Sequence, residues 1–293
     1  KTIGKIMILA SHIDLDGVGC AIVAKIFYPG IKIYHQDYDF IDEKVCSLLK
    51  NTSKKIIITD LSVSKEVAEF IQEKYSQRVH IYDHHKTAQE YLDQYSWTTY
   101  DITVSATKLF LQECKKNMPE TKIPAKLDKF VERVNDYDLW IHQYKDTIKY
   151  NDMFNLLGME LFTDAMYNRL INNQALIQQS DMFYLRGLWQ TKQKYYKKAL
   201  KTSIVDGDRL IVQATRYISE LSQYIRDIQP VPEEWKNIKY IDIINVENNG
   251  HSLRSYDLDF DVSEIAKANN GGGHPRAAGY PFQVSTEEWI KKL

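Results

Sequence analysis

The sequence contains little cysteine, no long apolar run and no excess of either charge. Its three cysteines, Cys20, Cys46 and Cys114, are too widely spaced for a zinc ribbon or a disulfide framework. No apolar stretch approaches the ~20 residues that a membrane-spanning helix needs. The first residues also turn polar too soon for a secretory signal. We therefore expect a cytoplasmic protein that makes no contact with a membrane.

The formal net charge is −1 and the isoelectric point is about 6.8. Proteins that hold long nucleic acids usually carry a clear basic excess, so a small anionic substrate fits this chain better. The length of 293 residues favours two domains, and 44% hydrophobic with 26% charged residues is typical of a globular protein.

Short apolar runs alternate with amphipathic segments in the first hundred residues. Strands are predicted at 5–10, 31–35, 54–60 and 79–83, and helices at 17–28, 41–49 and 64–75. This alternation predicts right-handed crossovers and a parallel sheet with helices on both faces. Later segments predict helices at 105–116, 125–140, 160–200 and 217–228, and strands at 209–215, 239–247 and 251–257. We expect an α/β protein of two domains: an N-terminal parallel sheet flanked by helices and a smaller C-terminal α/β domain.

Aspartate and histidine recur where the predicted strands end. The residues concerned are His12, Asp14, Asp16, Asp60, Asp83, His84 and His85, and a further aspartate pair, Asp136 and Asp138, ends a predicted helix. Any one of these alone is more readily explained as a helix cap or a solvated turn. Because parallel strands bring their carboxyl ends to one edge of a sheet, the combination predicts a metal site there.

The ligand chemistry indicates the metal. Carboxylates with a few imidazoles and no thiolate favour Mn²⁺ or Mg²⁺ over zinc, and the imidazoles favour Mn²⁺. Four aspartates suffice for two ions ~3.5–4 Å apart that share a bridging carboxylate. Such a pair activates water and neutralises charge on a phosphoryl group, which predicts hydrolysis of a phosphoester or a phosphoanhydride.

The ordered motifs resemble those of the DHH phosphoesterase superfamily. They are His12-x-Asp14-x-Asp16-Gly17, Thr-Asp60-Leu-Ser, Asp83-His84-His85, Asn-Asp136-Tyr-Asp138 and Gly271-Gly272-Gly273-His274 followed by PRAAG. The resemblance covers nearly the whole chain and is strongest to the nano-RNase and oligoribonuclease branch with NrnB-like members, to which the exonuclease RecJ is related. It implies a DHH catalytic domain with a dinuclear metal site and a helical linker over residues 1–190. A DHH-associated substrate-binding domain would follow over residues 200–293.

The resemblance also implies roles for individual residues. One Mn²⁺ would be held by His12, Asp14 and Asp60, and the other by Asp16, Asp60, His84 and Asp136, with Asp138 as the alternative to Asp136. Asp60 would bridge the ions, and His85 would act on the scissile phosphate as a catalytic residue. Asp83 would orient a histidine. Several relatives place their first histidine four residues before the first aspartate, where this chain has Ala10.

The glycine-rich segment suits phosphate binding on physical grounds as well. Consecutive glycines let backbone N–H groups approach an anion closely, and a histidine and an arginine follow them. We expect Gly272, Gly273, His274 and Arg276 to bind the substrate phosphate. The alternative is a flexible turn with no role in binding.

We expect a Mn²⁺-dependent phosphodiesterase, with Mg²⁺ as the alternative ion, that hydrolyses short oligonucleotides to mononucleotides. The same site suits a cyclic or linear dinucleotide, or a phosphoadenosine phosphate, as substrate. A RecJ-like exonuclease on longer single-stranded DNA, a pyrophosphatase and a binding protein without turnover are further alternatives. The partner would be a short oligonucleotide or nucleotide, and a homodimer is left open.

Overall fold

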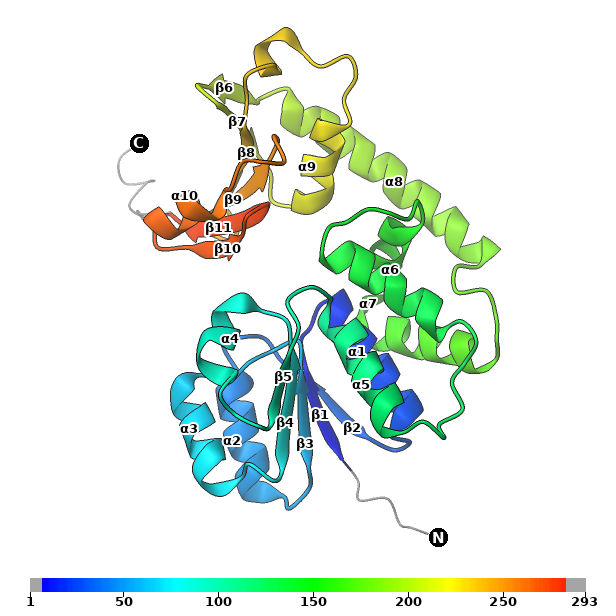
Figure 1. Ribbon diagram of the computed structural model, residues 1–293. Coiled ribbons are helices and arrows are strands. Elements are labelled where there is room, and N and C mark those ends of the chain that lie inside the picture. The colour runs from blue at the N-terminus through cyan, green and yellow to red at the C-terminus, as the bar shows by residue number, and fades with distance from the viewer. Residues whose placement is uncertain (1–6, 283–293) are drawn as a thin grey trace. The chain divides into compact units, whose positions relative to one another are not determined.

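A five-stranded parallel sheet organises the first part of the chain (Figure 1). The structure is a computed structural model that describes residues 7–282. The strands are β1 (Ile8–Ser11), β2 (Lys32–His35), β3 (Ile56–Thr59), β4 (Val79–Asp83) and β5 (Thr98–Tyr100). Their spatial order is β2-β1-β3-β4-β5, so β1 has β2 on one side and β3 on the other. The order of the chain therefore reverses beside β1, and in parallel sheets such a point opens a crevice at the carboxyl ends.

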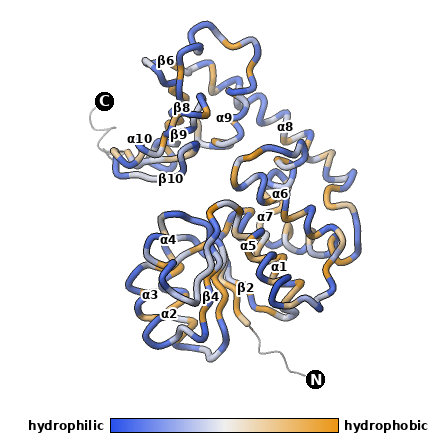
Figure 2. Tube along the Cα trace, viewed as in Figure 1, coloured by the Kyte–Doolittle hydropathy of each residue, from blue (hydrophilic) through white to orange (hydrophobic). Residues whose placement is uncertain are grey.

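Helices cover both faces of this sheet, as the sequence predicted. One face packs against α2 (Ile41–Asn51), α3 (Lys65–Lys74) and α4 (Lys86–Leu92). The other packs against α1 (Leu15–Phe27) and α5 (Ala106–Asn117), and α6 (Leu127–Asp138) and α7 (Thr147–Ile171) pack on these helices in turn. Successive strand residues face opposite cores: Leu9 joins the α1 side, whereas Ile8 and Ala10 join the α2 side. Strands apolar on both faces suit a parallel sheet, and Figure 2 shows this apolar colouring along them.

Some elements of this unit were not predicted. Strand β5 has three residues and pairs with β4, and α4 has seven, so neither gives a clear periodic pattern. Helix α7 runs across Gly158, whose φ of +72° interrupts the helical backbone and kinks it. Glycine tolerates this left-handed conformation at little cost.

The chain divides into two units between Leu185 and Arg186. The second contains most of α8 (Gln179–Leu200) and a six-stranded mixed sheet in the order β10-β11-β9-β8-β7-β6. Its strands are β6 (Ile204–Asp206), β7 (Arg209–Gln213), β8 (Tyr240–Asn245), β9 (Gly250–Ser255), β10 (Gly272–His274) and β11 (Ala277–Pro281). Helices α9 (Ile218–Arg226) and α10 (Ser263–Ala268) and the 3₁₀ turn Glu233–Trp235 complete it. The predicted α/β class is thus confirmed for both units. Strands β10 and β11 lie in the glycine-rich segment, for which no strand was predicted.

The described residues contain neither a membrane-crossing helix nor a disulfide bond. Within residues 7–282, no helix is both long and apolar enough to cross a bilayer. Cys20, Cys46 and Cys114 all carry free thiols, and Cys20 and Cys114 are buried. The sequence-based expectation of no disulfide framework therefore agrees with the structure.

Candidate metal centre

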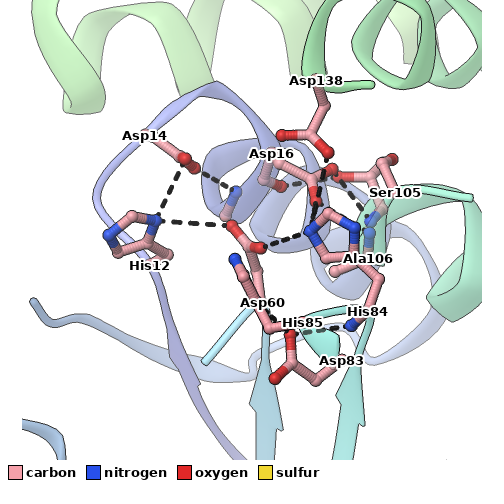
Figure 3. A network of polar contacts seen from close by, with 12 residues as sticks. His12, Asp14, Asp16, Asp60, Asp83, His84, His85, Ser105, Ala106 and Asp138 are labelled. Atoms are coloured by element: carbon pink, nitrogen blue, oxygen red, sulfur yellow. Dashed lines mark hydrogen bonds and ion pairs between the residues drawn. The ribbon is translucent and has the colours of Figure 1, made fainter. Parts of the chain in front are cut away.

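Three adjacent strand ends bring the predicted site residues together (Figure 3). In β1, β3 and β4 the residues Ser11, Thr59 and Tyr82 lie side by side in register. The side chains that follow them therefore reach the same edge of the sheet. They are His12, Asp14 and Asp16 after β1, Asp60 after β3, and Asp83, His84 and His85 at the end of β4.

Asp60 lies at the middle of the cluster. Its Oδ1 is 3.4 Å from Nε2 of His84, and its Oδ2 is 3.6 Å from Nδ1 of His12. The same His12 nitrogen is 3.1 Å from Oδ2 of Asp14. Asp60 also has a left-handed backbone with φ of +57°, an unfavourable conformation that proteins tend to retain at functional sites. Its two oxygens thus face two different groups of ligand atoms.

His84 points Nε2 at a second group of carboxylates. This nitrogen lies 3.5 Å from Oδ2 of Asp138 and 3.9 Å from Oδ2 of Asp16. Asp138 is the last residue of α6, where the partial negative charge of the helix terminus disfavours a carboxylate. A cation beside Asp138 would offset that cost.

Asp136, which the resemblance implies as a ligand, points away from this group of carboxylates. Its carboxylate accepts hydrogen bonds from the backbone N–H of Gln143 at 2.8 Å and of Tyr144 at 3.2 Å, and from the Thr147 hydroxyl. These bonds hold the turn between α6 and α7. Asp138, two residues later, faces the cluster instead, because the end of the helix directs the two side chains differently.

The amino terminus of α5 fixes Asp16. The backbone N–H groups of Ala106 and Thr107 donate to its two carboxylate oxygens at 2.8 and 3.0 Å, and the Thr107 hydroxyl donates to the Asp16 carbonyl at 2.6 Å. Ser105 caps α5, at the start of the helix predicted over 105–116, and accepts from the N–H of Lys108 at 3.4 Å. The sequence signalled this helix start, but not that its N–H groups hold a site residue.

Close packing shapes the loop from β1 to α1. Asp14 caps α1, and its side chain accepts from the N–H of Gly17 at 2.9 Å. A Cβ at Gly17 would lie 2.3 Å from the His12 carbonyl oxygen, so only glycine fits there. The same carbonyl oxygen accepts a hydrogen bond from Nδ1 of His35 at 2.8 Å. The loop is therefore held by the close packing at Gly17 and by the hydrogen bond from His35.

The sequence predicted that Asp83 orients a histidine, and the structure shows the contact. Oδ1 of Asp83 accepts from Nδ1 of His85 at 2.7 Å and from the N–H of His84 at 2.8 Å. Its Oδ2 accepts from the Ser62 hydroxyl at 2.6 Å. The other ring nitrogen of His85, Nε2, is 3.0 Å from the hydroxyl of Tyr38.

Burial and like charges shift the protonation of the cluster. Burial and the charges of Asp14 and Asp16 raise the pKa of Asp60 well above its ordinary value. Burial and the charge of Asp16 raise the pKa of Asp138 to about 8. Burial alone would lower the pKa of His12, but its contacts with Asp14 and Asp60 raise that pKa to about 10. Besides burial, neighbouring carboxylates contribute to all three shifts, so several acidic groups share a small buried volume.

The donor set fits divalent cations. His12, Asp14 and Asp60 form one group with ligand atoms within 4.8 Å of one another, and Asp16, His84 and Asp138 form another. In the described part of the chain, Oδ2 of Asp138 and Nδ1 of His84 are buried without a hydrogen-bond partner. Carboxylate oxygens with imidazole nitrogens suit Mn²⁺ or Mg²⁺, and Asp60 faces both groups.

The predicted phosphate-binding residues lie in the second unit. Gly272, Gly273, His274 and Arg276 are exposed on and just after β10. A Cβ at Gly273, whose φ is +134°, would lie 2.5 Å from Cα of Ala278 on β11. At Gly272 a Cβ would meet nothing within 4 Å. A side chain at Gly273 would thus clash with the paired strand β11, whereas one at Gly272 would extend into solvent.

Sequence comparison identifies two relatives, one of which matches along nearly the whole chain. No family model matches the sequence. Oligoribonuclease NrnB of Bacillus subtilis strain 168 is 31% identical over 295 residues, which cover 92% of this chain and 71% of that protein. A 3′,5′-cyclic-nucleotide phosphodiesterase of Helicobacter pylori strain 26695 is 30% identical over 147 residues, which cover 44% of this chain and 42% of that protein.

A solved structure shows the same fold. RecJ of Thermus thermophilus, determined in complex with Mn²⁺, matches with a TM-score of 0.63 and 11% sequence identity. The match covers 99% of this chain and 51% of RecJ. At this identity the likeness establishes the two-domain architecture alone.

Proposed function

The chain belongs to the DHH phosphoesterase superfamily, in its NrnB-like branch, and from this membership we propose that it is a Mn²⁺-dependent phosphodiesterase that hydrolyses short oligonucleotides to mononucleotides. The superfamily consists of hydrolases, so the chain is an enzyme of that class. The choice of substrate and of metal is our proposal. It is supported by the B. subtilis relative, whose name is oligoribonuclease, and by a net charge of −1, which does not suit a long polyanion.

One observation carries the metal-dependent part of this proposal: the two oxygens of Asp60 face two separate groups of ligand atoms. We assign His12, Asp14 and Asp60 to one ion, and Asp16, Asp60, His84 and Asp138 to the other. When bound, such a pair supplies a nucleophilic water at neutral pH and neutralises charge on the phosphoryl oxygens. Hydrolysis adds this water at phosphorus and breaks the bond to the leaving nucleoside oxygen.

The chain's own residues then position and complete the site. The N–H groups of Ala106 and Thr107 fix Asp16, so this carboxylate needs no rearrangement when a ligand binds. Asp83 fixes the ring of His85 at the edge of the cluster. In the proposal His85 contacts the scissile phosphate and helps to protonate the leaving oxygen.

In the second unit, we assign the substrate phosphate to the exposed segment that includes Gly272, Gly273, His274 and Arg276. The open space at Gly272 and the guanidinium of Arg276 support this assignment. In this proposal residues 1–190 form the catalytic domain and residues 200–293 the substrate-binding domain. Arg276→Ala should raise KM with little change in unfolding stability, because this side chain is exposed.

A cyclic or linear dinucleotide is the second candidate substrate. The H. pylori relative, named a 3′,5′-cyclic-nucleotide phosphodiesterase, supports only the opening of a cyclic phosphodiester, and that match spans 42% of the relative. The same two-ion chemistry opens a cyclic phosphodiester and cuts a linear one.

A panel assay tests the proposal and separates the candidates. Purified protein with Mn²⁺, and separately with Mg²⁺, is given RNA and DNA of two to five nucleotides, a longer single strand, a cyclic dinucleotide and phosphoadenosine phosphate. We expect the highest kcat/KM on the two- to five-nucleotide substrates and mononucleotides as products. Intact short oligonucleotides would rule out the main proposal, and preferential turnover of the cyclic dinucleotide would establish the second. Asp60→Ala is the inactive control.

A further inference from the structure

Tyr38 contacts the candidate metal centre, although no motif pointed to it. It lies in the turn between β2 and α2, and its hydroxyl is 3.0 Å from Nε2 of His85. Its ring centroid is 4.7 Å from that of His12, and its ring meets the ring of His85 edge-on at 5.8 Å. One aromatic ring thus links the histidine that follows β1 with the histidine that follows β4.

This ring is held in place and yet open to solvent. Tyr38 is 49% exposed. Its own N–H donates to Oδ1 of Asp37 at 2.7 Å, and the turn is closed by the N–H of Phe40 and the Asp37 carbonyl at 3.1 Å. The turn is tied to the sheet because the N–H of Gln36 donates to the Ser11 carbonyl at 2.9 Å. A group fixed in this way can bind a ligand without a large loss of conformational entropy.

Two further apolar side chains are exposed nearby, one in the loop between β1 and α1 and the other in the turn between β2 and α2. Ile13, between His12 and Asp14, is 39% exposed, and Phe40 is 59% exposed. Exposed apolar surface beside polar residues is typical of ligand-binding grooves. Metal binding and phosphate chemistry explain the carboxylates and histidines, but neither needs an exposed aromatic ring next to them.

We propose that Tyr38 is a specificity-determining residue on which a nucleoside base of the substrate stacks, so that the phosphate joined to that nucleoside lies at the metal centre. The inference rests on the proposed function and adds the requirement for a base at a defined position. Tyrosine offers a flat face that accepts any base, so stacking would favour nucleotides over other phosphoesters without selecting a sequence. The contacts of the ring with the rings of His12 and His85 hold it beside the centre.

Abasic substrates separate stacking from other roles of Tyr38. Kinetics with Mn²⁺ are measured on a dinucleotide and on two analogues that lack either the 5′ or the 3′ base. For the unmodified protein, one analogue should show KM raised ~10-fold, the magnitude of one stacked base. Tyr38→Leu should raise KM on the complete dinucleotide by the same factor, leave KM on that analogue unchanged and change kcat less than KM. Tyr38→Phe should retain the low KM.

Binding measured without turnover makes the test independent of hydrolysis. Equilibrium dialysis of non-hydrolysable phosphonate analogues of the same three compounds against the Mn²⁺-loaded protein should show the same ranking of the variants. Tyr184→Leu, which removes another exposed tyrosine, on α8, should behave as the unmodified protein. If Tyr38→Leu weakens binding of the complete dinucleotide and of the abasic analogues equally, the stacking role is wrong. It is also wrong if the substitution lowers kcat alone, even where hydrolysis is observed. If the dinucleotide binds with the predicted ranking but is not cut, the proposed function fails and the stacking role stands.

Discussion

Asp138 places its Oδ2 3.5 Å from Nε2 of His84, at the end of α6 and against the edge of the parallel sheet. This contact joins the helical part of the first unit to the strand ends. It completes a second group of ligand atoms beside the one formed around His12. The aspartate two residues earlier contributes to the fold and not to this group.

Replacing each of the two aspartates of α6 in turn should therefore affect Mn²⁺ binding and stability differently. Asp138→Ala should lower Mn²⁺ affinity and turnover by at least ~10–100-fold, because it removes a ligand. Asp136→Asn should leave Mn²⁺ affinity nearly unchanged and lower the free energy of unfolding by roughly 1–3 kcal/mol, because it disturbs three hydrogen bonds. Calorimetric Mn²⁺ titration and urea unfolding measure the two effects. The reverse pattern would restore Asp136 as the ligand.

The metal-free protein should become less stable as the pH rises from 5 to 8. The pKa of Asp138 in the folded state is about 8, against an ordinary value of 3.8. Between these values the folded state holds a proton that the unfolded chain has released, so stability falls as pH rises through this window. Urea unfolding with a chelator measures the trend. Asp138→Asn should reduce the fall and stabilise the metal-free protein at pH 8 by roughly 1–2 kcal/mol. Stability that rises over this range would contradict the assigned charge imbalance.

Gly17 should not tolerate even a methyl group. Gly17→Ala would place Cβ 2.3 Å from the backbone oxygen of His12, so we expect a loss of roughly 1–3 kcal/mol in unfolding stability and weaker Mn²⁺ binding. Gly187→Ala is the matched control, since its Cβ would meet nothing within 4 Å and α8 is helical there. The control should be neutral or stabilised by up to ~1 kcal/mol. Equal effects of both changes would show that the β1–α1 loop is not tightly packed.

Asp83 should act through His85. Asp83→Asn keeps the size of the side chain but removes the charge that holds Nδ1 of His85, so kcat should fall ~10–100-fold. Mn²⁺ affinity should change less than it does in Asp138→Ala. Ser62→Ala, which removes a second donor to the same carboxylate, should have a smaller effect on kcat. A loss of Mn²⁺ affinity as large as that of a ligand variant would instead identify Asp83 as a ligand.

The sequence predicted the parts of the site that follow from strand periodicity. The residues His12, Asp14, Asp16, Asp60 and His84 follow buried strands of one parallel sheet, and in such a sheet adjacency at the carboxyl edge is unavoidable. The apolar runs also predicted the first four strands, and the amphipathic segments predicted the three helices between them.

Other parts depend on geometry that a sequence does not display. Asp136 and Asp138 are two residues apart at the end of a helix, and only the path of the turn to α7 decides which of them faces the sheet. The donors that fix Asp16 are backbone N–H groups of Ala106 and Thr107, which any residue except proline could supply. Tyr38 is one of 20 tyrosines, and only its contacts with His12 and His85 in the folded chain set it apart.

The central claim is a pair of divalent ions that share Asp60, and anomalous diffraction from Mn²⁺-soaked crystals tests it most directly. We predict two anomalous peaks ~3.5–4 Å apart, one beside His12 and Asp14 and the other beside Asp16, His84 and Asp138, with Asp60 between them. A single peak, or peaks that do not contact Asp60, would contradict the account.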